Sequence, residues 1–294
     1  MKPLFSKGKR IVIFDTSNVV ARISAVTTGN NASFVATFCK SLLRYTQTLG
    51  SNVSWVWVIE GCGKTRRKRL FSGYKSRLRP LAPLLEAMLP LALSVLKNVR
   101  CHLVQAPQGE ADDAIACVVT KALHKNPTTQ VVIVSEDKDL WQLIKDPWVT
   151  VYSQTVSTIS EAVVKHHLKG VPAANVCLWK ALAGDASDNL PKVPGLNRAT
   201  ACKLAMQYHT PKELYKGLLK NRRTLMVTTI QKQKLLEAKA QVKLMYKLVK
   251  LRDKLAVVTT TYKSRSKALR KFLQTHSVFN FSKDELLLIS NKRF

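Results

Sequence analysis

The stretch RIVIFDTSN (residues 10–18) decides the class of fold, because an almost continuously apolar run ends there on a carboxylate. Runs of this kind are typical of strands that are buried on both faces of a sheet. Other runs along the chain share this character or are rich in β-branched and aromatic residues. The five predicted strands are Arg10–Phe14, Val53–Ile59, His102–Val104, Val131–Val134 and Val149–Tyr152.

Helical patterns lie between these strands, at Phe34–Leu49, Leu84–Leu96 and Ala111–His124. This alternation predicts an α/β fold with a mainly parallel sheet that helices cover on both sides. The second half of the chain has a different pattern. After Val151 we predict no strand until Ala256–Thr260, and we expect one long amphipathic helix in between, at Gln231–Leu251.

The charge of the chain is unusual. It has 48 Lys and Arg against 18 Asp and Glu, a net charge of +30, which favours nucleic acid as a partner, with an anionic membrane surface second. The longest apolar tract, Leu81–Leu96, contains Pro83, Glu86 and Pro90 and does not fit a membrane span. Six scattered cysteines without CxxC spacing, and no secretory signal, predict reduced thiols, no zinc site and a cytoplasmic protein.

Acidic residues are scarce, and nine of the 18 fall in five short motifs. Asp15, Glu60 and Asp137 each lie directly after a predicted strand or within three residues of its end. In an open parallel sheet the carboxyl ends of the strands share one edge, where ligands bind. The nine residues are Asp15, Glu60, Glu110, Asp112, Asp113, Asp137, Asp139, Asp185 and Asp188.

The spacing within these motifs pairs the carboxylates. Glu110 and Asp113 are three apart at a helix start and share a face, while Asp137 and Asp139 are two apart in a segment that we expect to be extended. Two like charges ~4 Å apart repel by roughly 4 kcal/mol at an effective dielectric of ~20, so cations must lie among them or some must protonate. Oxygen-only ligands suit Mg²⁺ or Mn²⁺, and a pair of such ions serves phosphodiester hydrolysis. Taken singly, each acid could equally be a surface residue, a helix cap or a salt-bridge partner.

Five motifs, in this order, resemble the flap endonuclease and 5′→3′ exonuclease family, which includes phage 5′ nucleases and the N-terminal domain of bacterial DNA polymerase I. The resemblance runs from about Arg10 to Leu255. It implies a three-layer α/β/α sandwich of the PIN-like type, with a catalytic domain at 1–165 and an arch at about 61–98. A helical DNA-binding region at 166–294 would hold a helix–hairpin–helix at about 178–208. The motifs are IVIFDTSN, GYKSRLRP, GEADDAIA, SEDKDLWQL and GDASDNLPKVPGLNRATA.

The same resemblance implies roles for single residues. The acidic residues named above match the family's metal-site carboxylates, except that Glu60 stands where the family usually has Asp, which leaves its metal contact open. Lys75 matches a lysine that stabilises the scissile phosphate, and Arg22 and Lys180 match other basic positions near it. Tyr74 matches an aromatic residue on which the terminal base can stack.

The hairpin segment DNLPKVPGLNRATACKL departs from the family at two glycines, which are Lys192 and Asn197 here. Asn tolerates a left-handed backbone, whereas Lys192 is harder to explain. Gly195 would let backbone N–H groups approach a duplex phosphate, and the family's loop also binds a K⁺ ion through backbone oxygens. The family's helix-start lysine is Ala199 here, beside Arg198. The DNA contacts predicted for this segment are Lys192, Gly195, Arg198 and Lys203.

Two stretches are strongly basic. Lys64–Arg79 carries eight Lys and Arg in sixteen positions and no acid, which favours a funnel for single-stranded 5′ DNA, with contacts from Arg77 and Arg79. A solvated charged loop is the plain alternative. Beyond Asp188, 24 Lys and Arg stand against five acids in 106 residues, which predicts a duplex-binding face.

The sequence therefore predicts a 5′ nuclease that uses two Mg²⁺ or Mn²⁺ ions, acting as an exonuclease, a flap endonuclease or both in DNA replication or repair. Its substrate would be DNA with a 5′ single-stranded end or flap beside duplex, with RNA primers a further substrate, and the protein would be a monomer. A PIN-like ribonuclease is one alternative, although it needs no helix–hairpin–helix. A non-catalytic nucleic-acid-binding protein is another, although it predicts gaps in the set of acids.

Overall fold

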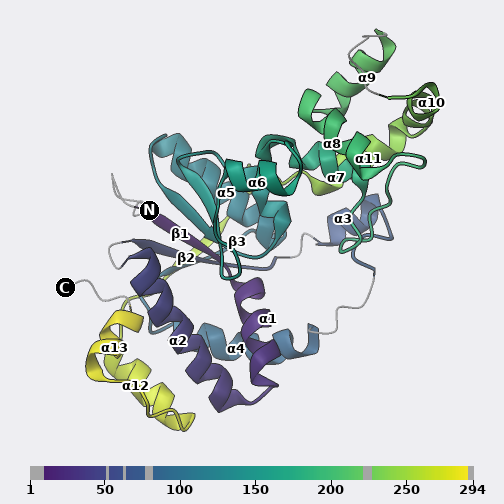
Figure 1. Cartoon of the computed structure of the whole chain (residues 1–294). Helices are drawn as coiled ribbons and strands as arrows, with labels where there is room; N and C mark the ends of the chain where they lie inside the picture. Colours follow the sequence, from purple (N-terminus) through teal and green to yellow (C-terminus); the bar gives the residue numbers. More distant parts are fainter. Residues whose placement is uncertain (1–9, 51–52, 62–63, 77–81, 221–226, 291–294) are drawn as a thin grey trace. The chain divides into compact units, whose positions relative to one another are not determined.

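The computed structural model of the chain describes residues 10–50, 53–61, 64–76, 82–220 and 227–290 (Figure 1). Arg77 and Arg79, two of the predicted DNA contacts, lie outside the described residues. The chain divides into two units, each assembled from segments that are distant in sequence. The first unit comprises Met1–Cys62, Arg79–Glu136 and Asp253–Phe294, and the second comprises Gly63–Leu78 and Asp137–Arg252.

A sheet forms the middle of the first unit, with its strands in the order β4-β1-β2-β3-β7. The first four are parallel, and β7 is antiparallel to β3. All five residues of β1 are buried, as its apolar run predicts. The expected mainly parallel sheet is confirmed. The strands are β1 (Ile11–Asp15), β2 (Ser54–Ile59), β3 (His102–Gln105), β4 (Val131–Val134) and β7 (Val258–Thr261).

Helices cover both faces of this sheet (Figure 1). One face packs on α5, and the other is covered by α1, α2 and α4, while α12 and α13 add to the outside of α2. The three-layer arrangement implied by the resemblance is therefore confirmed. The helices are α1 (Thr16–Thr27), α2 (Asn31–Leu49), α4 (Ala82–Leu96), α5 (Ala111–Lys125), α12 (Ser266–Thr275) and α13 (Lys283–Ile289).

Aromatic side chains fill the core between the sheet and α2. Phe14 on β1 stacks on Trp57 of β2 with ring centroids 4.1 Å apart, and it meets Tyr45 of α2 edge-on at 5.1 Å. All three side chains are buried. Aromatic pairs in these geometries add to the stabilisation that burial alone provides. This packing fixes the carboxyl end of β1, where Asp15 lies.

The second unit is mostly helical. Its two strands, β5 (Val149–Ser153) and β6 (Ser157–Ile159), pair antiparallel. Helices α7 and α8 form a helical hairpin, and α11 packs on α7 and α9. Of all the helices that the structure describes, none has both the length and the apolar character that a membrane span requires. The helices of this unit are α3 (Lys64–Leu70), η1 (Lys138–Leu143, a 3₁₀ helix), α6 (Glu161–His167), η2 (Ala173–Asn175, a 3₁₀ helix), α7 (Val176–Ala183), α8 (Arg198–Gln207), α9 (Pro211–Leu219), α10 (Thr229–Glu237) and α11 (Lys239–Val249).

The single helix expected at Gln231–Leu251 is wrong, because α10 ends at Glu237 and α11 begins at Lys239. The hydroxyl group of Tyr215 donates a hydrogen bond to the carbonyl oxygen of Leu235 at 2.9 Å. In a continuous helix that oxygen would accept from the N–H of Lys239. A tertiary contact thus competes with the helical hydrogen bond, which a periodic pattern cannot reveal.

The expectation of no strand between Val151 and Ala256 is also wrong, because β6 pairs with β5. Two of the three residues of β6 are exposed, so no apolar run marks it. Ser157, the first residue of β6, has φ 67°, a left-handed backbone that sequence composition did not indicate.

Candidate active site

Five of the predicted acidic residues belong to the first unit. The parallel register places Asp15, the last residue of β1, beside Val58, two residues before Glu60. The carboxylate of Glu60 accepts a hydrogen bond from the backbone N–H of Ala111 at 2.9 Å, which ties it to the first residue of α5. The structure therefore brings the end of β2 and the start of α5 together. The first carboxylate group consists of Asp15, Glu60, Glu110, Asp112 and Asp113.

Asp15 is 5% exposed and uses both oxygens within the protein. Its Oδ1 accepts from the backbone N–H of Asn18 at 3.1 Å, so it caps α1, and its Oδ2 accepts from the hydroxyl of Ser135 at 3.0 Å. Helix N-termini favour negative charge, because their first N–H groups lack partners within the helix. The sequence places a strand end, a helix cap and a carboxylate in one residue.

Glu110 and Asp113 lie together at the N-terminus of α5, as their spacing predicts. The backbone N–H of Glu110 donates to the Asp113 carboxylate at 3.2 Å, and the two residues are 2% and 0% exposed. Gly109 permits this arrangement, because a Cβ there would lie 2.7 Å from Leu255 and 3.2 Å from the Cβ of Asp113. Asp112, on the same helical turn, is partly exposed.

Three residues beside this group were missed by the sequence analysis. Glu136 forms an ion pair with Arg22 at 3.0 Å, and its backbone N–H donates to the side chain of Asn18 at 3.1 Å. Ser135 donates to Asp15, as described above. A usable signal was present, because Ser135 and Glu136 directly follow β4 and precede Asp137 in the motif that was already singled out.

The remaining four acids, Asp137, Asp139, Asp185 and Asp188, belong to the second unit and form the second carboxylate group. The ammonium group of Lys180, which is 6% exposed on α7, contacts the carboxylates of both Asp139 and Asp185, the latter at 2.6 Å. Asp139 is itself buried. A buried lysine thus contacts two buried or half-buried carboxylates and offsets part of their negative charge.

The expectation of an extended segment at Asp137–Asp139 is wrong. Asp137 is the N-cap of the 3₁₀ helix η1, and its Oδ1 accepts from the backbone N–H of Asp139 at 2.8 Å. Asp side chains readily form such local bonds to the backbone two residues on, which favours a turn over an extended strand.

The pKa values of two residues in this group shift in opposite directions. Burial raises the pKa of Asp185, but the charge of Lys180 and hydrogen bonds from Lys180 and Ser187 outweigh it, so the pKa lies below its ordinary value. Burial raises the pKa of Asp188 above its ordinary value, against the charge of Lys75. The charges of Asp185 and Asp137 add to that rise. The charge of Lys180 thus favours the ionised form of Asp185, whereas burial disfavours the ionised form of Asp188.

Lys75 and Tyr74 lie in a turn of the second unit. The backbone N–H of Lys75 donates to the carbonyl oxygen of Asp188 at 3.0 Å, which places the predicted phosphate-binding lysine next to the second carboxylate group. The Lys75 ammonium lies 5.1 Å from the centroid of the Tyr74 ring. Tyr74 is 3% exposed, so little of its ring surface is accessible here and base stacking stays a prediction.

Lys192 and Asn197, which stand where the family has glycines, do not have a left-handed backbone in this structure. Asn197 has φ −85° and is the N-cap of α8, accepting from the N–H of Thr200 at 2.8 Å, so the idea that it replaces a left-handed glycine is wrong. Lys192 is also absent from the described residues with positive φ. Gly195 has φ 74°, as a glycine in this turn allows. The side chain of Gln241 donates to the carbonyl oxygen of Lys192 at 3.1 Å and so holds the loop.

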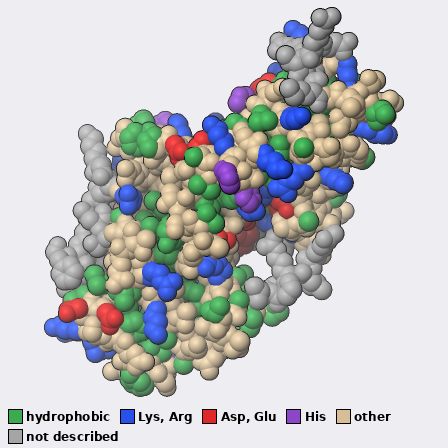
Figure 2. Space-filling model, in the orientation of Figure 1, with side chains coloured by type: hydrophobic (Ala, Val, Ile, Leu, Met, Phe, Trp, Pro, Cys, Tyr) green, Lys and Arg blue, Asp and Glu red, His purple; other side chains and the backbone are tan. Residues whose placement is uncertain are grey.

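Exposed basic side chains gather on the second unit. Figure 2 shows Lys and Arg side chains spread over its visible face. Arg198, at the start of α8, lies with its guanidinium 4.9 Å from the centroid of the Trp179 ring, and Lys203 is exposed on the same helix. Among the residues described between Lys192 and Lys250, the exposed basic ones are Lys192, Arg198, Lys203, Lys212, Lys216, Lys220, Lys234, Lys239, Lys243, Lys247 and Lys250.

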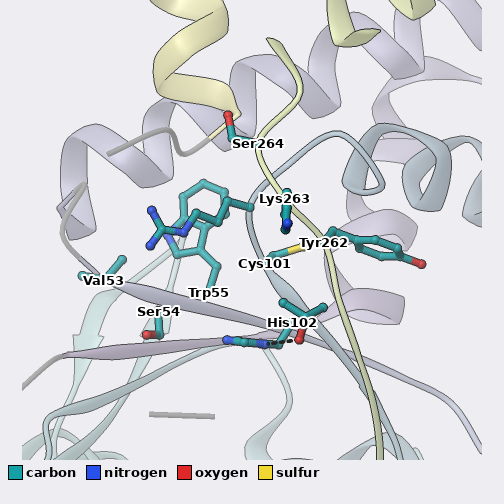
Figure 3. Close-up of a pocket in the computed structure, with 10 residues that line it drawn as sticks. Val53, Ser54, Trp55, Cys101, His102, Tyr262, Lys263 and Ser264 are labelled. Atoms are coloured by element: carbon teal, nitrogen blue, oxygen red, sulfur yellow. Dashed lines mark hydrogen bonds between the residues drawn. The ribbon is translucent and has the colours of Figure 1, made fainter. Parts of the chain in front are cut away.

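No set of three or more His, Cys, Asp or Glu side chains within the described ranges is arranged so that it could hold a metal ion. Each carboxylate group instead uses protein donors, the first mainly backbone N–H groups and the second Lys180. A pocket of ≈ 240 Å³ lies elsewhere in the first unit, between the starts of β2 and β3 and the residues after β7 (Figure 3). Its lining includes Trp55, His102 and Lys263 but no carboxylate, so it is not the predicted metal site.

Comparisons with known proteins show the family and the fold of the chain. The family model of the 5′-3′ exonuclease N-terminal resolvase-like domain matches residues 10–169, and that of the 5′-3′ exonuclease C-terminal SAM fold matches residues 171–271. Flap endonuclease Xni of Shewanella woodyi is 32% identical over 252 residues, which cover 83% of this chain and 93% of the relative. DNA polymerase I of Caldicellulosiruptor bescii is 28% identical over 220 residues, which cover 71% of this chain and 26% of the polymerase. The solved structure of T5 5′-exonuclease with bound zinc has the same fold, with a TM-score of 0.68 at 17% identity, covering 96% of this chain and all of the other.

Fold and sequence together define an enzyme of the 5′ nuclease class, as predicted. The chain belongs to the 5′-3′ exonuclease family, and its relatives include flap endonucleases.

Proposed function

We propose that this chain hydrolyses DNA phosphodiesters at or near 5′ ends, as an exonuclease, a flap endonuclease or both, in a reaction that depends on divalent metal ions. The observation that carries the proposal is the set of nine acidic residues. All nine stand in the family's order, within a chain that is 32% identical to a flap endonuclease, and only Glu60 departs from the family's residue type. A non-catalytic relative would not need to keep this set.

The donor set fits Mg²⁺ or Mn²⁺, because it offers carboxylate oxygens and no His or Cys. The contacts of Lys180 also support a cation site, because its ammonium group already lies between the carboxylates of Asp139 and Asp185. In the first group, Asp15, Glu110, Asp112 and Asp113 are the proposed ligands of the more tightly bound ion. Asp137 is proposed to help hold or orient the same ion.

Asp139, Asp185 and Asp188 are proposed to serve a second ion, partly through water. Two ions bound in this way would lower the pKa of an attacking water and stabilise the leaving oxygen. Glu60 stays in the proposed metal set, and its carboxylate also accepts from the N–H of Ala111 and so holds the start of α5.

Three basic residues are proposed to act on the scissile phosphate. By the family resemblance, Lys75 and Arg22 would each offset charge that develops on the phosphate as the P–O bond breaks. Arg22 must exchange its ion pair with Glu136 for the phosphate, which is feasible because its side chain is 37% exposed. Lys180 orients the carboxylates of Asp139 and Asp185.

The basic face of the second unit is proposed to grip duplex DNA, mainly through phosphates. Gly195 and Arg198 belong to the hairpin that approaches the backbone, and Lys192 and Lys203 add positive charge beside it. The described carbonyl oxygens of Pro191 and Lys192 both accept from Gln241, so a K⁺ ion at this loop would share them. The same proposal includes RNA primers as a further substrate. It also assigns catalysis to residues 1–165 and DNA binding to residues 166–294.

Digestion of 5′-labelled flap, nicked, blunt and single-stranded DNA with Mg²⁺ and with EDTA tests this function. We expect 5′ products only with the metal, and no cleavage by Asp113→Asn. Cleavage restricted to single-stranded RNA would instead indicate a PIN-like ribonuclease. Binding without cleavage in any metal would indicate a non-catalytic nucleic-acid-binding protein.

A further inference from the structure

Two parts of the second unit that are 113 to 116 residues apart in sequence are joined beside the second carboxylate group. The side chain of Asn189 donates to the carbonyl oxygen of Gly73 at 2.9 Å and lies 3.0 Å from the hydroxyl of Ser76. Between these two anchor points, the backbone N–H of Lys75 donates to the carbonyl oxygen of Asp188 at 3.0 Å. Three hydrogen bonds therefore join the turn that carries Lys75 to the loop that carries Asp185 and Asp188.

The backbone of Lys75 depends on this support. Its φ is 48°, in the left-handed region that a residue with a long side chain rarely adopts, at a cost of roughly 1–2 kcal/mol. Asn189 has φ 57°, which asparagine tolerates better. A strained lysine next to carboxylates persists only where its surroundings impose the conformation, and the bonds from Asn189 to Gly73 and Ser76 supply that constraint.

The turn also has no room for a side chain at Gly73. A Cβ at Gly73 would lie 2.8 Å from the ring of Phe71 and 3.3 Å from the Nδ2 of Asn189. The N–H of Tyr74 donates to the carbonyl of Phe71 at 3.0 Å, and that of Ser76 donates to Gly73 at 3.2 Å. The turn is thus closed on itself, and its described contacts with the carboxylate loop are the side chain of Asn189 and the carbonyl oxygen of Asp188.

We propose that Asn189 is a positioning residue for Lys75, which fixes the lysine relative to the carboxylates of Asp185 and Asp188. This inference rests on the proposed function of Lys75 at the scissile phosphate. Asn189 does not touch the reacting atoms. It acts by holding the backbone on both sides of Lys75, so that the ammonium group and the metal-binding carboxylates keep one geometry. In sites of this kind a displacement of ~1 Å can cost about 10²-fold in rate.

The test compares Asn189→Gly with wild type in Mg²⁺-dependent cleavage of a 5′-flap substrate. Glycine keeps φ 57° accessible and removes both side-chain contacts. We expect kcat to fall by about 10- to 100-fold, with KM within about threefold, because substrate binding is retained and geometry is lost. Ser76→Ala is the matched control, since it keeps the bond to Gly73 and should lower kcat by less than about threefold.

The decisive measurement is a double-mutant cycle with Lys75→Ala. If Asn189 acts through Lys75, Asn189→Gly will change kcat by less than about threefold in the Lys75→Ala background, although it has its full effect in wild type. Equal fold losses in both backgrounds, or an unchanged kcat for Asn189→Gly, would overturn the inference. An unchanged kcat for Lys75→Ala alone would instead overturn the proposed role of Lys75. Should Asn189→Gly fail to fold, Asn189→Ser, which shortens the side chain without adding a charge, enters the same cycle with the same expected outcomes.

Discussion

The two carboxylate groups balance their charge in different ways. In the first, described contacts come mainly from the backbone, such as the N–H of Ala111 to Glu60 and that of Glu110 to Asp113. In the second, a buried ammonium group contacts Asp139 and Asp185. Helix N-termini carry only a partial positive charge, whereas lysine carries a full one. We expect the first group, which supplies most of the proposed ligands of the tighter ion, to bind that ion.

The largest expected effect is on cleavage. Asp113→Asn should lower the rate on a 5′ flap by at least about 10³-fold, or about 4 kcal/mol in the barrier, because a proposed ligand of the tighter ion is lost. Asp185→Asn should cost less, about 10- to 100-fold, because Lys180 still neutralises Asp139. Single-turnover rates at saturating Mg²⁺ check this. Equal losses in the two variants would remove the distinction between the groups.

A second contrast concerns the stability of the metal-free protein. Lys180→Met leaves two carboxylates without their buried cation and should lower the free energy of unfolding by about 3–5 kcal/mol. Arg22→Met in the first unit removes a part-exposed ion pair with Glu136 and should cost at most about 1 kcal/mol. Urea denaturation in EDTA measures both. A small effect of Lys180→Met would show that the lysine is not what balances the second group.

The pH dependence of stability should separate Asp185 from Asp188. The folded pKa of Asp185 is lowered, so it contributes stability above its unfolded pKa, and this stability is lost as the pH falls through the folded pKa. The folded pKa of Asp188 is raised, so its contribution is present below the unfolded pKa and is lost as the pH rises through the folded pKa. In EDTA at neutral pH, Asp185→Asn should therefore lower the Tm and Asp188→Asn should raise it.

Both differences should shrink in acid, once the wild-type carboxyl groups are protonated. Melting curves of the three proteins across the acid range provide the check. Tm shifts of the same sign for the two variants at neutral pH would contradict the opposite pKa shifts of Asp185 and Asp188.

The smallest expected effect belongs to Glu136, which the sequence analysis did not select. Glu136→Gln releases Arg22 from its ion pair and should change the free energy of unfolding by less than about 1 kcal/mol. Because a freed Arg22 can reach phosphate more readily, the KM for DNA should stay equal or fall. A marked rise in KM would show that Glu136 is needed to present Arg22.

Much of the fold could be predicted from the sequence, because strands buried on both faces leave long apolar runs. The runs ending at Phe14, Ile59 and Val134 each became a parallel strand, and their ends hold Asp15, Glu60 and Ser135–Glu136. Elements that depend on tertiary contacts could not be predicted from the sequence. The break at Ala238 follows from a hydrogen bond of Tyr215, and β6 is too short and exposed to show a pattern.

For the candidate site, too, some features could be predicted from the sequence and others could not. Residue type and order identified the acids, since a family motif and a strand end are both visible in the sequence. The contacts of those acids were not visible. The bond from Asp139 N–H to Asp137 replaced an expected extended segment, and the roles of Ser135 and Asn189 depend on partners more than 100 residues away. A single sequence does not show which residues of distant segments come into contact.

Calorimetric titration of the metal-free protein with Mn²⁺ tests the central claim most directly, that these carboxylates hold divalent ions with unequal affinity. Wild type should bind one ion more tightly than a second, with Asp113→Asn losing the tighter phase and Asp185→Asn the weaker one. Identical titrations for all three proteins, or no saturable binding in wild type, would contradict the account.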